Sequence, residues 1–228
     1  MRLDDRLQAL ADFVPEGARA ADIGTDHGYL AVALVESGKA VHVIASDLNR
    51  GPCEAAKRTV AEAGLGKSID VRQGDGLAPL APGEADTICI AGMGGVLMTQ
   101  ILEAGADVLA KTRRLVLQPM NGAGKLRRWL YQNGWQIDGE KLVVADGRLY
   151  EILTAVPGKA PMPEPILLEI GPVLWHEKPA LLRQHIEALL FSARREAAGM
   201  EKSEQAVKSE KYRLVKAYIE ALEAHLKG

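Results

Sequence analysis

One stretch near the N-terminus, residues 21–30, constrains the fold more than any other part of the chain. A short apolar run leads into it, and an apolar helical pattern follows. Two glycines, Gly24 and Gly28, stand four residues apart at this crossing from strand to helix. A side chain there would block a ligand that approaches the backbone, and glycine adopts positive φ at little cost. The pattern predicts a ligand-binding turn of an α/β fold.

An acid stands at the end of the next predicted strand. Residues 41–47 form an apolar run that ends at Asp47, about 20 residues beyond the glycine turn, where nucleotide-binding α/β folds place a carboxylate against ribose hydroxyls. Together, the turn and the acid predict a domain that binds a nucleoside-bearing cofactor.

The overall composition limits which binding partners and which cellular compartment we expect. The chain has 228 residues and a formal net charge of −2, which suits one α/β domain with a smaller appendage and gives no bulk attraction to nucleic acid. Any RNA contact would need a local basic patch. The two cysteines, Cys53 and Cys89, lack partners at metal-ligand spacing, so we expect neither a metal nor a disulfide framework. No apolar run reaches membrane length and the first residues do not resemble a signal peptide, so a reducing cytoplasm is expected.

Strand and helix patterns alternate over most of the chain. Strands are expected at 20–23, 41–47, 69–72, 86–91 and 115–118, and helices at 2–14, 28–37, 51–64, from 95 onward and at 124–133. Residues 141–145 and 149–156 then alternate as a hairpin around Asp146 and Gly147. This order predicts a mostly parallel sheet that is covered on both faces and has an antiparallel edge.

The composition changes near Pro157. Residues 157–165 are rich in proline and predict a linker. Residues 180–227 carry apolar residues at helical spacing in two stretches, with a break near 199–203. We predict two long helices in an antiparallel, coiled-coil-like hairpin, and hence two domains, 1–157 and 158–228.

The turn also distinguishes among nucleoside cofactors. A dinucleotide fingerprint reads G-x-G-x-x-G, whereas residues 24–28 read GTDHG and no phosphate-binding lysine follows. Asp26 in this turn would repel a pyrophosphate and attract a cationic sulfonium with its α-amino group. Asp22, just before the turn, would hold the turn or that amine. The turn therefore predicts S-adenosylmethionine.

Two further turns follow the third and fourth predicted strands. Asp75 is placed to take the adenine amino group, and residues 90–95 follow the fourth strand. Because ligands bind beyond the carboxyl ends of parallel strands, we expect these turns and Asp47 to meet at one site. Each feature taken singly has a structural explanation, such as a helix cap at His27 or a buried thiol at Cys89.

Several motifs together resemble the bacterial tRNA (adenine-22-N1) methyltransferases. They are DIGTDHGYL (22–30), DLNRGP (47–52), GDGL (74–77), IAGMGG (90–95), LQP (117–119), YEIL (150–153) and EIGP (169–172). The resemblance covers nearly the whole chain. It implies a Rossmann-like class I methyltransferase domain with a mostly parallel seven-stranded sheet, and a small C-terminal helical domain that binds tRNA. Met120 departs from the family, since an asparagine is expected directly after Pro119.

With the resemblance, the candidate site residues fall into three sets. The catalytic set is Asp26, Tyr29, Gly92, Met93 and Gly94. The cofactor-binding set is Asp22, Gly24, Thr25, Asp26, His27, Gly28, Asp47, Leu48, Asn49, Gly74, Asp75, Gly76, Ala91 and Gly92. The tRNA-binding set, taken from basic stretches of the chain, is Lys125, Arg127, Arg128, Arg194 and Arg195.

The implied reaction is methylation of N1 of adenine 22. The N1 lone pair attacks the methyl group in line, backbone carbonyls of residues 92–95 hold N6, and Asp26 lies near the developing positive charge. The expected partner is tRNA, with no membrane and no obligate protein partner, and a seam internal to the tail favours a monomer. Two alternatives stay open: a small-molecule methyltransferase on the same scaffold and a non-catalytic cofactor-binding module. The glycine spacing disfavours a nicotinamide dehydrogenase.

Overall fold

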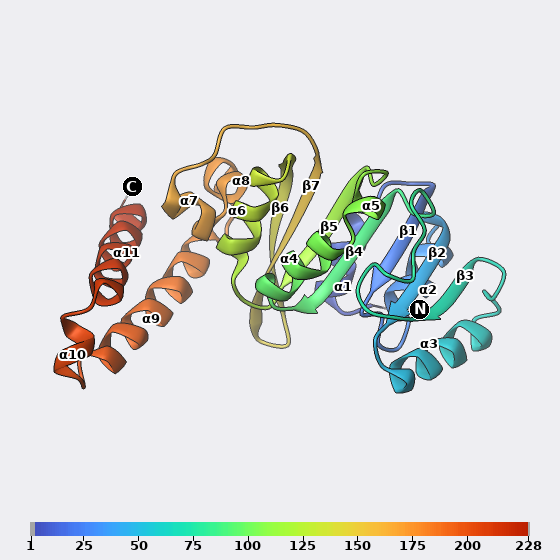
Figure 1. Ribbon diagram of the computed structural model, residues 1–228, viewed down its shortest axis with the longest axis horizontal. Coiled ribbons are helices and arrows are strands. Elements are labelled where there is room, and N and C mark those ends of the chain that lie inside the picture. The colour runs from blue at the N-terminus through green and yellow to red at the C-terminus, as the bar shows by residue number, and fades with distance from the viewer. Residues whose placement is uncertain (1–2, 228) are drawn as a thin grey trace. The chain divides into compact units, whose positions relative to one another are not determined.

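The computed structural model describes residues 3–227, and the chain divides into two compact units (Figure 1). The first unit ends at Met162 and the second begins at Pro163.

The first unit is built on a seven-stranded sheet in the order β3-β2-β1-β4-β5-β7-β6. β7 runs antiparallel to both of its neighbours, and the other neighbouring strands are parallel. The strands are β1 (Ala18–Ile23), β2 (Ala40–Asp47), β3 (Ile69–Gln73), β4 (Thr87–Met93), β5 (Arg114–Pro119), β6 (Trp135–Ala145) and β7 (Arg148–Pro157). The mostly parallel sheet predicted from the sequence is confirmed.

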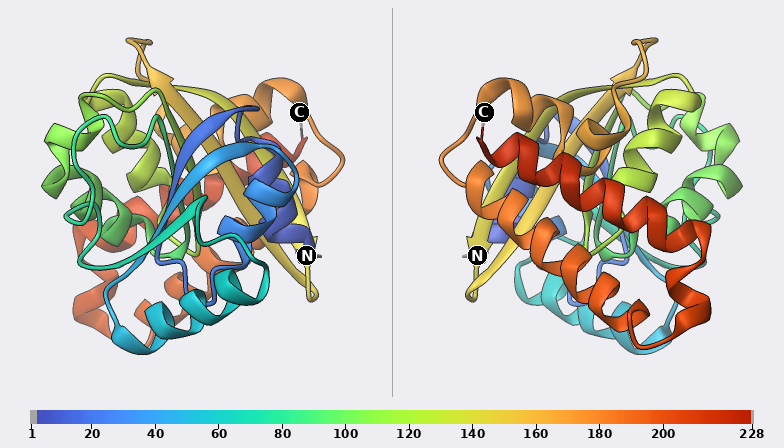
Figure 2. Two further views of the ribbon diagram at one scale, coloured as in Figure 1. Left: turned by 90° about the vertical axis from the view of Figure 1, so that its right-hand side faces the viewer. Right: turned by 90° about the vertical axis from the view of Figure 1, so that its left-hand side faces the viewer.

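Helices cover both faces of this sheet (Figure 2). They are α1 (Asp5–Asp12), α2 (Tyr29–Glu36), α3 (Arg50–Glu62), α4 (Gly95–Ala104), α5 (Ala106–Leu109) and α6 (Ala123–Gln132). One core lies between α1 to α3 and the sheet, where Leu10, Leu34, Val43 and Val116 are fully buried. The central strands carry continuous apolar runs because both of their faces are covered.

The hairpin lies at the edge of the sheet, as predicted, but its first strand is longer than predicted. β6 begins at Trp135, six residues before the predicted start at 141, because a register shift between Ile137 and Gly139 interrupts the alternation that the prediction used. β7 lies between β5 and β6, so the antiparallel strand is inside the sheet and β6 forms the edge.

The second unit is helical. Its helices are α7 (Pro165–Ile170), α8 (Pro172–Glu177), α9 (Leu182–Met200), α10 (Glu204–Val207) and α11 (Glu210–Lys227). α9 and α11 lie side by side in opposite directions (Figure 2), as the two predicted long helices. Ion pairs between Lys211 and Glu196 and between Arg194 and Glu223, each with an N–O distance of 2.7 Å, link the two helices.

α7 and α8 were not predicted. Each has six residues, which is too short for apolar periodicity to emerge, although each begins with a proline in its first turn. Across residues 3–227, none of the helices has the length and apolar character that crossing a membrane would require.

Candidate active site

A cavity of about 300 Å³ opens at the carboxyl ends of β1 to β4. The turns predicted to meet do so here. The predicted residues that line this cavity are Gly24, Asp47, Leu48, Asn49, Gly74, Asp75, Gly76, Ala91, Gly92 and Met93. Its volume lies at the lower end of the range for small-molecule sites, roughly 300–1,000 Å³.

Four lining residues were missed from the sequence: Ile23, Ser46, Leu97 and Ile101. Ile23 and Ser46 are adjacent to predicted residues at the strand ends. Leu97 and Ile101 are four residues apart on α4. This spacing places both side chains on one face of the helix, and it is the sequence signal that could have identified them.

Seven residues of the catalytic and cofactor-binding sets lie outside the cavity lining: Asp22, Thr25, Asp26, His27, Gly28, Tyr29 and Gly94. The Asp26 and His27 side chains are exposed, with their Oδ1 and Nε2 atoms 3.6 Å apart. The His27 ring stacks on Tyr29 with centroids 5.4 Å apart. These three side chains therefore form an exposed polar and aromatic group in the turn that borders the cavity.

The first turn depends on glycine at Gly24, where φ is +76°. A Cβ atom there would overlap the methyl group of Met93, so the bare backbone lets the turn pack directly against the side chain at the end of β4. Asp26 itself has φ of +51°, a left-handed conformation that aspartate and asparagine tolerate better than most residues.

Asp22 holds this turn from beneath. Its side chain is buried, and its Oδ2 accepts a hydrogen bond from the Thr25 hydroxyl at 2.7 Å. Burial raises the pKa of Asp22 to about 6; the Thr25 hydrogen bond opposes this shift, and the negative charge of Asp47 adds to it. Asp22 is thus a carboxyl group poised to change its charge when a cation arrives nearby.

Asp47 is held at the end of β2 by backbone donors. Its Oδ1 accepts from the Asn49 N–H at 2.9 Å, and its Oδ2 accepts from the Asp26 N–H at 3.4 Å. Each carboxylate oxygen has a further lone pair. The fixed carboxylate can therefore accept hydroxyl donors from a ligand in the cavity.

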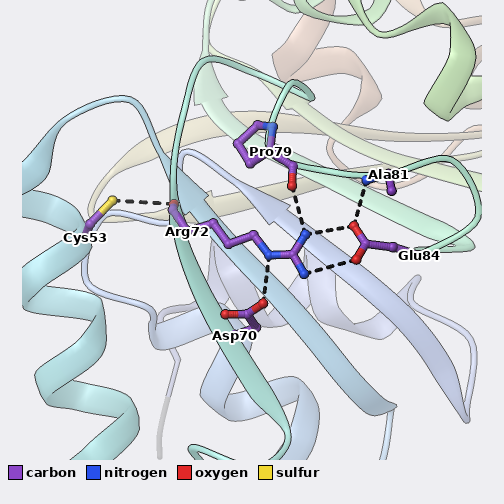
Figure 3. Close-up of polar contacts among 6 residues, drawn as sticks. All are labelled: Cys53, Asp70, Arg72, Pro79, Ala81 and Glu84. Carbon is purple, nitrogen blue, oxygen red and sulfur yellow. Dashed lines mark hydrogen bonds and ion pairs between the residues drawn. The ribbon is translucent and has the colours of Figure 1, made fainter.

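The loop that carries Asp75 is closed by a charged network (Figure 3). The Arg72 guanidinium donates to both Glu84 carboxylate oxygens, at 2.7 and 3.1 Å, and to the Pro79 carbonyl at 2.8 Å. Asp70 accepts from Arg72 Nε at 2.7 Å. The Arg72 hydrogen bond, helped by the Ala81 N–H, lowers the pKa of Glu84 to about 2. We call Arg72 and Glu84 the loop clamp.

The C-terminal end of β4 contains a break in strand pairing. Ala91 pairs with Gln118 and Met93 with Pro119, and the register shifts between them, so Gly92 lies outside the paired positions. The Met93 carbonyl accepts from the Met120 N–H at 2.8 Å, and the Gly94 carbonyl accepts from the Met98 N–H at 3.0 Å. The carbonyl groups of Met93 and Gly94 are therefore already engaged by backbone donors of the protein.

The predicted role of Arg127 in tRNA binding is wrong. Its side chain is fully buried, and its guanidinium donates to Glu140 and Glu151, each at 2.6 Å. It therefore cannot reach a phosphate. Lys125 and Arg128, on the same helix, are exposed. The prediction failed because α6 is amphipathic, and Arg127 lies on its buried face, against β6 and β7, whereas the other two cations lie on its exposed face.

Two further features of the described residues bear on the site. No group of three or more potential metal-ligating His, Cys, Asp or Glu side chains occurs in residues 3–227. A hollow of about 430 Å³, lined by Trp129, Trp135 and neighbours from α4 to α6, shares no residue with the cavity at the ends of β1 to β4 and contains none of the predicted site residues.

Comparisons with known proteins agree with this geometry. A family model described as a methyltransferase domain matches residues 3–153. The curated tRNA (adenine(22)-N(1))-methyltransferase of Bacillus subtilis is 39% identical, over 96% of this chain and 98% of that protein.

Solved structures match over the full length as well. The crystal structure of the B. subtilis m1A22 tRNA methyltransferase TrmK has a TM-score of 0.90 and 37% identity, and the match covers 99% of both chains. A putative tRNA (m1A22) methyltransferase from Streptococcus pneumoniae, solved with S-adenosyl-L-methionine, has a TM-score of 0.85 and 34% identity, over 99% of this chain and 100% of that one.

Proposed function

The chain belongs to the tRNA (adenine(22)-N(1))-methyltransferase family, and from that premise we propose that it methylates N1 of adenine 22 in tRNA, with S-adenosylmethionine bound in the cavity at the ends of β1 to β4. The observation that carries the proposal is the convergence of Gly24, Asp47, Asp75 and Gly92 on that one cavity.

The cavity fits this cofactor by charge and by shape. Asp47 and Asp75 are the charged residues lining it within the described part of the chain, and both are acidic. Acids favour a cationic sulfonium and disfavour the pyrophosphate of a dinucleotide. We assign the ribose hydroxyls to Asp47, the adenine to the turn at Asp75, and the methionine portion to the turn at Gly24. The bound cofactor supplies an electrophilic methyl group.

The residues around Gly92 orient the acceptor base. Adenine N1 carries a free lone pair, so no base has to deprotonate it before it forms the new N–C bond as the C–S bond breaks. The sulfonium charge is neutralised and the adenine ring becomes cationic. The Gly92 carbonyl accepts from the N6 amino group, which fixes N1 in line and favours positive charge on the ring.

We also propose that the two parts of the chain have different functions. Residues 1–157 bind the cofactor and carry the chemistry, and residues 158–228 contact the tRNA through exposed cations such as Arg195. The apolar seam of the tail lies between its own helices, α9 and α11, which supports a monomer. A tRNA substrate places the enzyme in the cytoplasm.

The deciding experiment is transfer from labelled S-adenosylmethionine to an unmodified tRNA transcript, with nucleoside analysis of the product. We expect 1-methyladenosine with the natural transcript and none when adenine 22 is replaced by guanine. A transcript with purine at position 22, which lacks N6, should react slowly if the Gly92 carbonyl contact matters. Cofactor binding without transfer to tRNA would favour a small-molecule acceptor or a non-catalytic module.

Asp26 is proposed to stabilise the developing positive charge. Asp26→Asn removes the charge and keeps a residue that tolerates positive φ, so the backbone should stay as it is. We expect a lower kcat for 1-methyladenosine formation with the dissociation constant of the cofactor little changed. Retention of both binding and turnover would exclude this role.

A further inference from the structure

A polar group outside the lining of the cofactor cavity contacts Gly92. Arg6 on α1, Gln118 at the end of β5 and Tyr150 on β7 come together there although they are far apart in sequence. Arg6 Nη1 donates to Gln118 Oε1 at 2.8 Å, and its guanidinium carbon lies 5.6 Å from the centre of the Tyr150 ring. Arg6 Nη1 also lies 3.8 Å from where a Cβ of Gly92 would stand.

Gln118 has its amide fixed in one orientation. The side chain is fully buried. Its Oε1 accepts from two donors, Arg6 Nη1 and the Gly92 N–H at 3.1 Å, while its Nε2 donates to the Pro119 carbonyl at 3.0 Å. A flipped amide would turn its NH₂ toward two donors and its oxygen toward an acceptor. Arg6 therefore helps to decide which atom of Gln118 faces Gly92.

Gly92 needs this support because of its backbone. It lies in the register shift between β4 and β5, with φ of +76°, so the regular strand pairing does not hold its N–H. The Gln118 side-chain oxygen accepts the hydrogen bond from that N–H, in place of a carbonyl of a neighbouring strand. Bulges of this kind redirect backbone groups at active sites.

Arginine suits the task better than lysine. Its planar guanidinium presents Nη1 to Gln118 and its face to the Tyr150 ring, with Nη2 3.8 Å from Asp4 Oδ2. A lysine ammonium supplies the charge but not the planar fork or the extended stacking face.

We propose that Arg6 is a positioning residue for methyl transfer: acting through Gln118, it fixes Gly92 so that the Gly92 carbonyl meets the N6 amino group of the target adenine. This rests on the proposed function. The N-terminal helix α1 is thereby part of the catalytic apparatus, although it contributes no residue to the cofactor cavity.

The first test compares Arg6→Met and Arg6→Lys with the unchanged enzyme. We expect Arg6→Met to lower kcat at saturating tRNA by roughly 100-fold, the scale of a small misplacement at a reacting centre, while the dissociation constant of S-adenosylmethionine stays within about twofold by calorimetry. Arg6→Lys should recover part of kcat, and added guanidinium at low millimolar concentration should recover part of the Arg6→Met loss. Unchanged kcat in Arg6→Met, or a parallel loss of cofactor binding and melting temperature, would overturn the proposal.

Gln118 gives an independent arm that does not depend on the folding of the Arg6 variants. Gln118→Leu removes the oxygen acceptor for both donors and should match Arg6→Met. Gln118→Glu keeps that acceptor but turns a second oxygen toward the Pro119 carbonyl, so its kcat should lie between those of Gln118→Leu and the unchanged enzyme. The Arg6→Met loss should be small in the Gln118→Leu background, because both changes break one chain of contacts. Additive losses would overturn the proposal.

The same assays separate the two levels of inference. An unchanged enzyme that forms no 1-methyladenosine overturns the proposed function, and the positioning role with it. An active enzyme whose kcat is unchanged by the Arg6 and Gln118 substitutions overturns the positioning role alone.

Discussion

At the scale of single residues, Asp22 is a buried titratable group beneath the turn to which we assign the methionine portion of the cofactor. Its pKa is raised from 3.8 to about 6, mainly by burial. Because the folded state holds this proton more tightly than the unfolded chain does, the group's contribution to stability falls as pH rises from about 4 to about 6. A cation bound nearby favours the ionised form and reverses the shift.

We therefore predict that S-adenosylmethionine binding releases protons near pH 6, and that its affinity rises from pH 5 to 7, by up to about tenfold per pH unit below the pKa. Calorimetry in buffers of different ionisation enthalpy measures the released protons. Asp22→Asn, which can still accept from Thr25, should bind without proton release. Equal proton release in this variant would assign the titration to another group.

Neighbouring residues of one helix can have opposite roles, as Arg127 and Arg128 do. Arg127 is fully buried between Glu140 and Glu151, whose charges raise its pKa although burial works against this, while Arg128 is exposed. Arg127→Met would leave two buried or half-buried carboxylates without their cation and should cost about 3–5 kcal/mol of unfolding free energy. Arg128→Met, the matched control, should change stability by no more than about 0.5 kcal/mol. Denaturant titration separates them, and equal losses would contradict the assignment.

At the scale of elements, the loop clamp holds the loop between β3 and β4, which carries Asp75. Arg72 keeps the pKa of Glu84 near 2, below its ordinary 4.5. Because the folded state lowers the pKa of this carboxyl group, the clamp stabilises the fold fully above about pH 4.5. This stabilisation is lost as the pH falls toward 2.

Glu84→Gln should therefore weaken S-adenosylmethionine binding several-fold at pH 7, because the turn at Asp75 loses its fixed position. The matched control is Glu54→Gln, which removes an exposed ion pair with Lys57 (N–O distance 3.0 Å) within α3, and exposed pairs of this kind contribute little. Calorimetry measures the dissociation constant of S-adenosylmethionine for both variants. Equal weakening of binding in the two would show a general effect of charge and contradict the role of the clamp.

The elements of the first unit were largely predictable because each leaves a local signature. β1 and β4 are apolar runs that end at glycine turns, and β2 is an apolar run that ends at Asp47, so the cavity at their carboxyl ends followed from the sequence. The start of β6 was not predictable, since the register shift at Gly139 breaks its alternation. The burial of Arg127 and the contact of Arg6 with Gln118 depend on long-range packing, which local patterns do not encode.

At the scale of the whole molecule, a net charge of −2 means that tRNA binding must depend on local clusters of cations. Long-range attraction alone would make every exposed cation equivalent, whereas direct phosphate contacts make only some of them matter. Arg195 on α9 is exposed, as is Lys67 between α3 and β3, and a change to glutamate alters the net charge equally at both.

We predict that Arg195→Glu lowers tRNA affinity and reduces the slope of log affinity against log salt by about 1, as loss of one phosphate contact should. Lys67→Glu should leave the slope unchanged, and both variants should bind S-adenosylmethionine normally, since neither residue lines the cofactor cavity. Titration of labelled tRNA at several salt concentrations measures both quantities. Equal effects of the two substitutions would show that tRNA binding depends on the net charge of the protein and not on a phosphate contact at Arg195. The helical tail would then need another role.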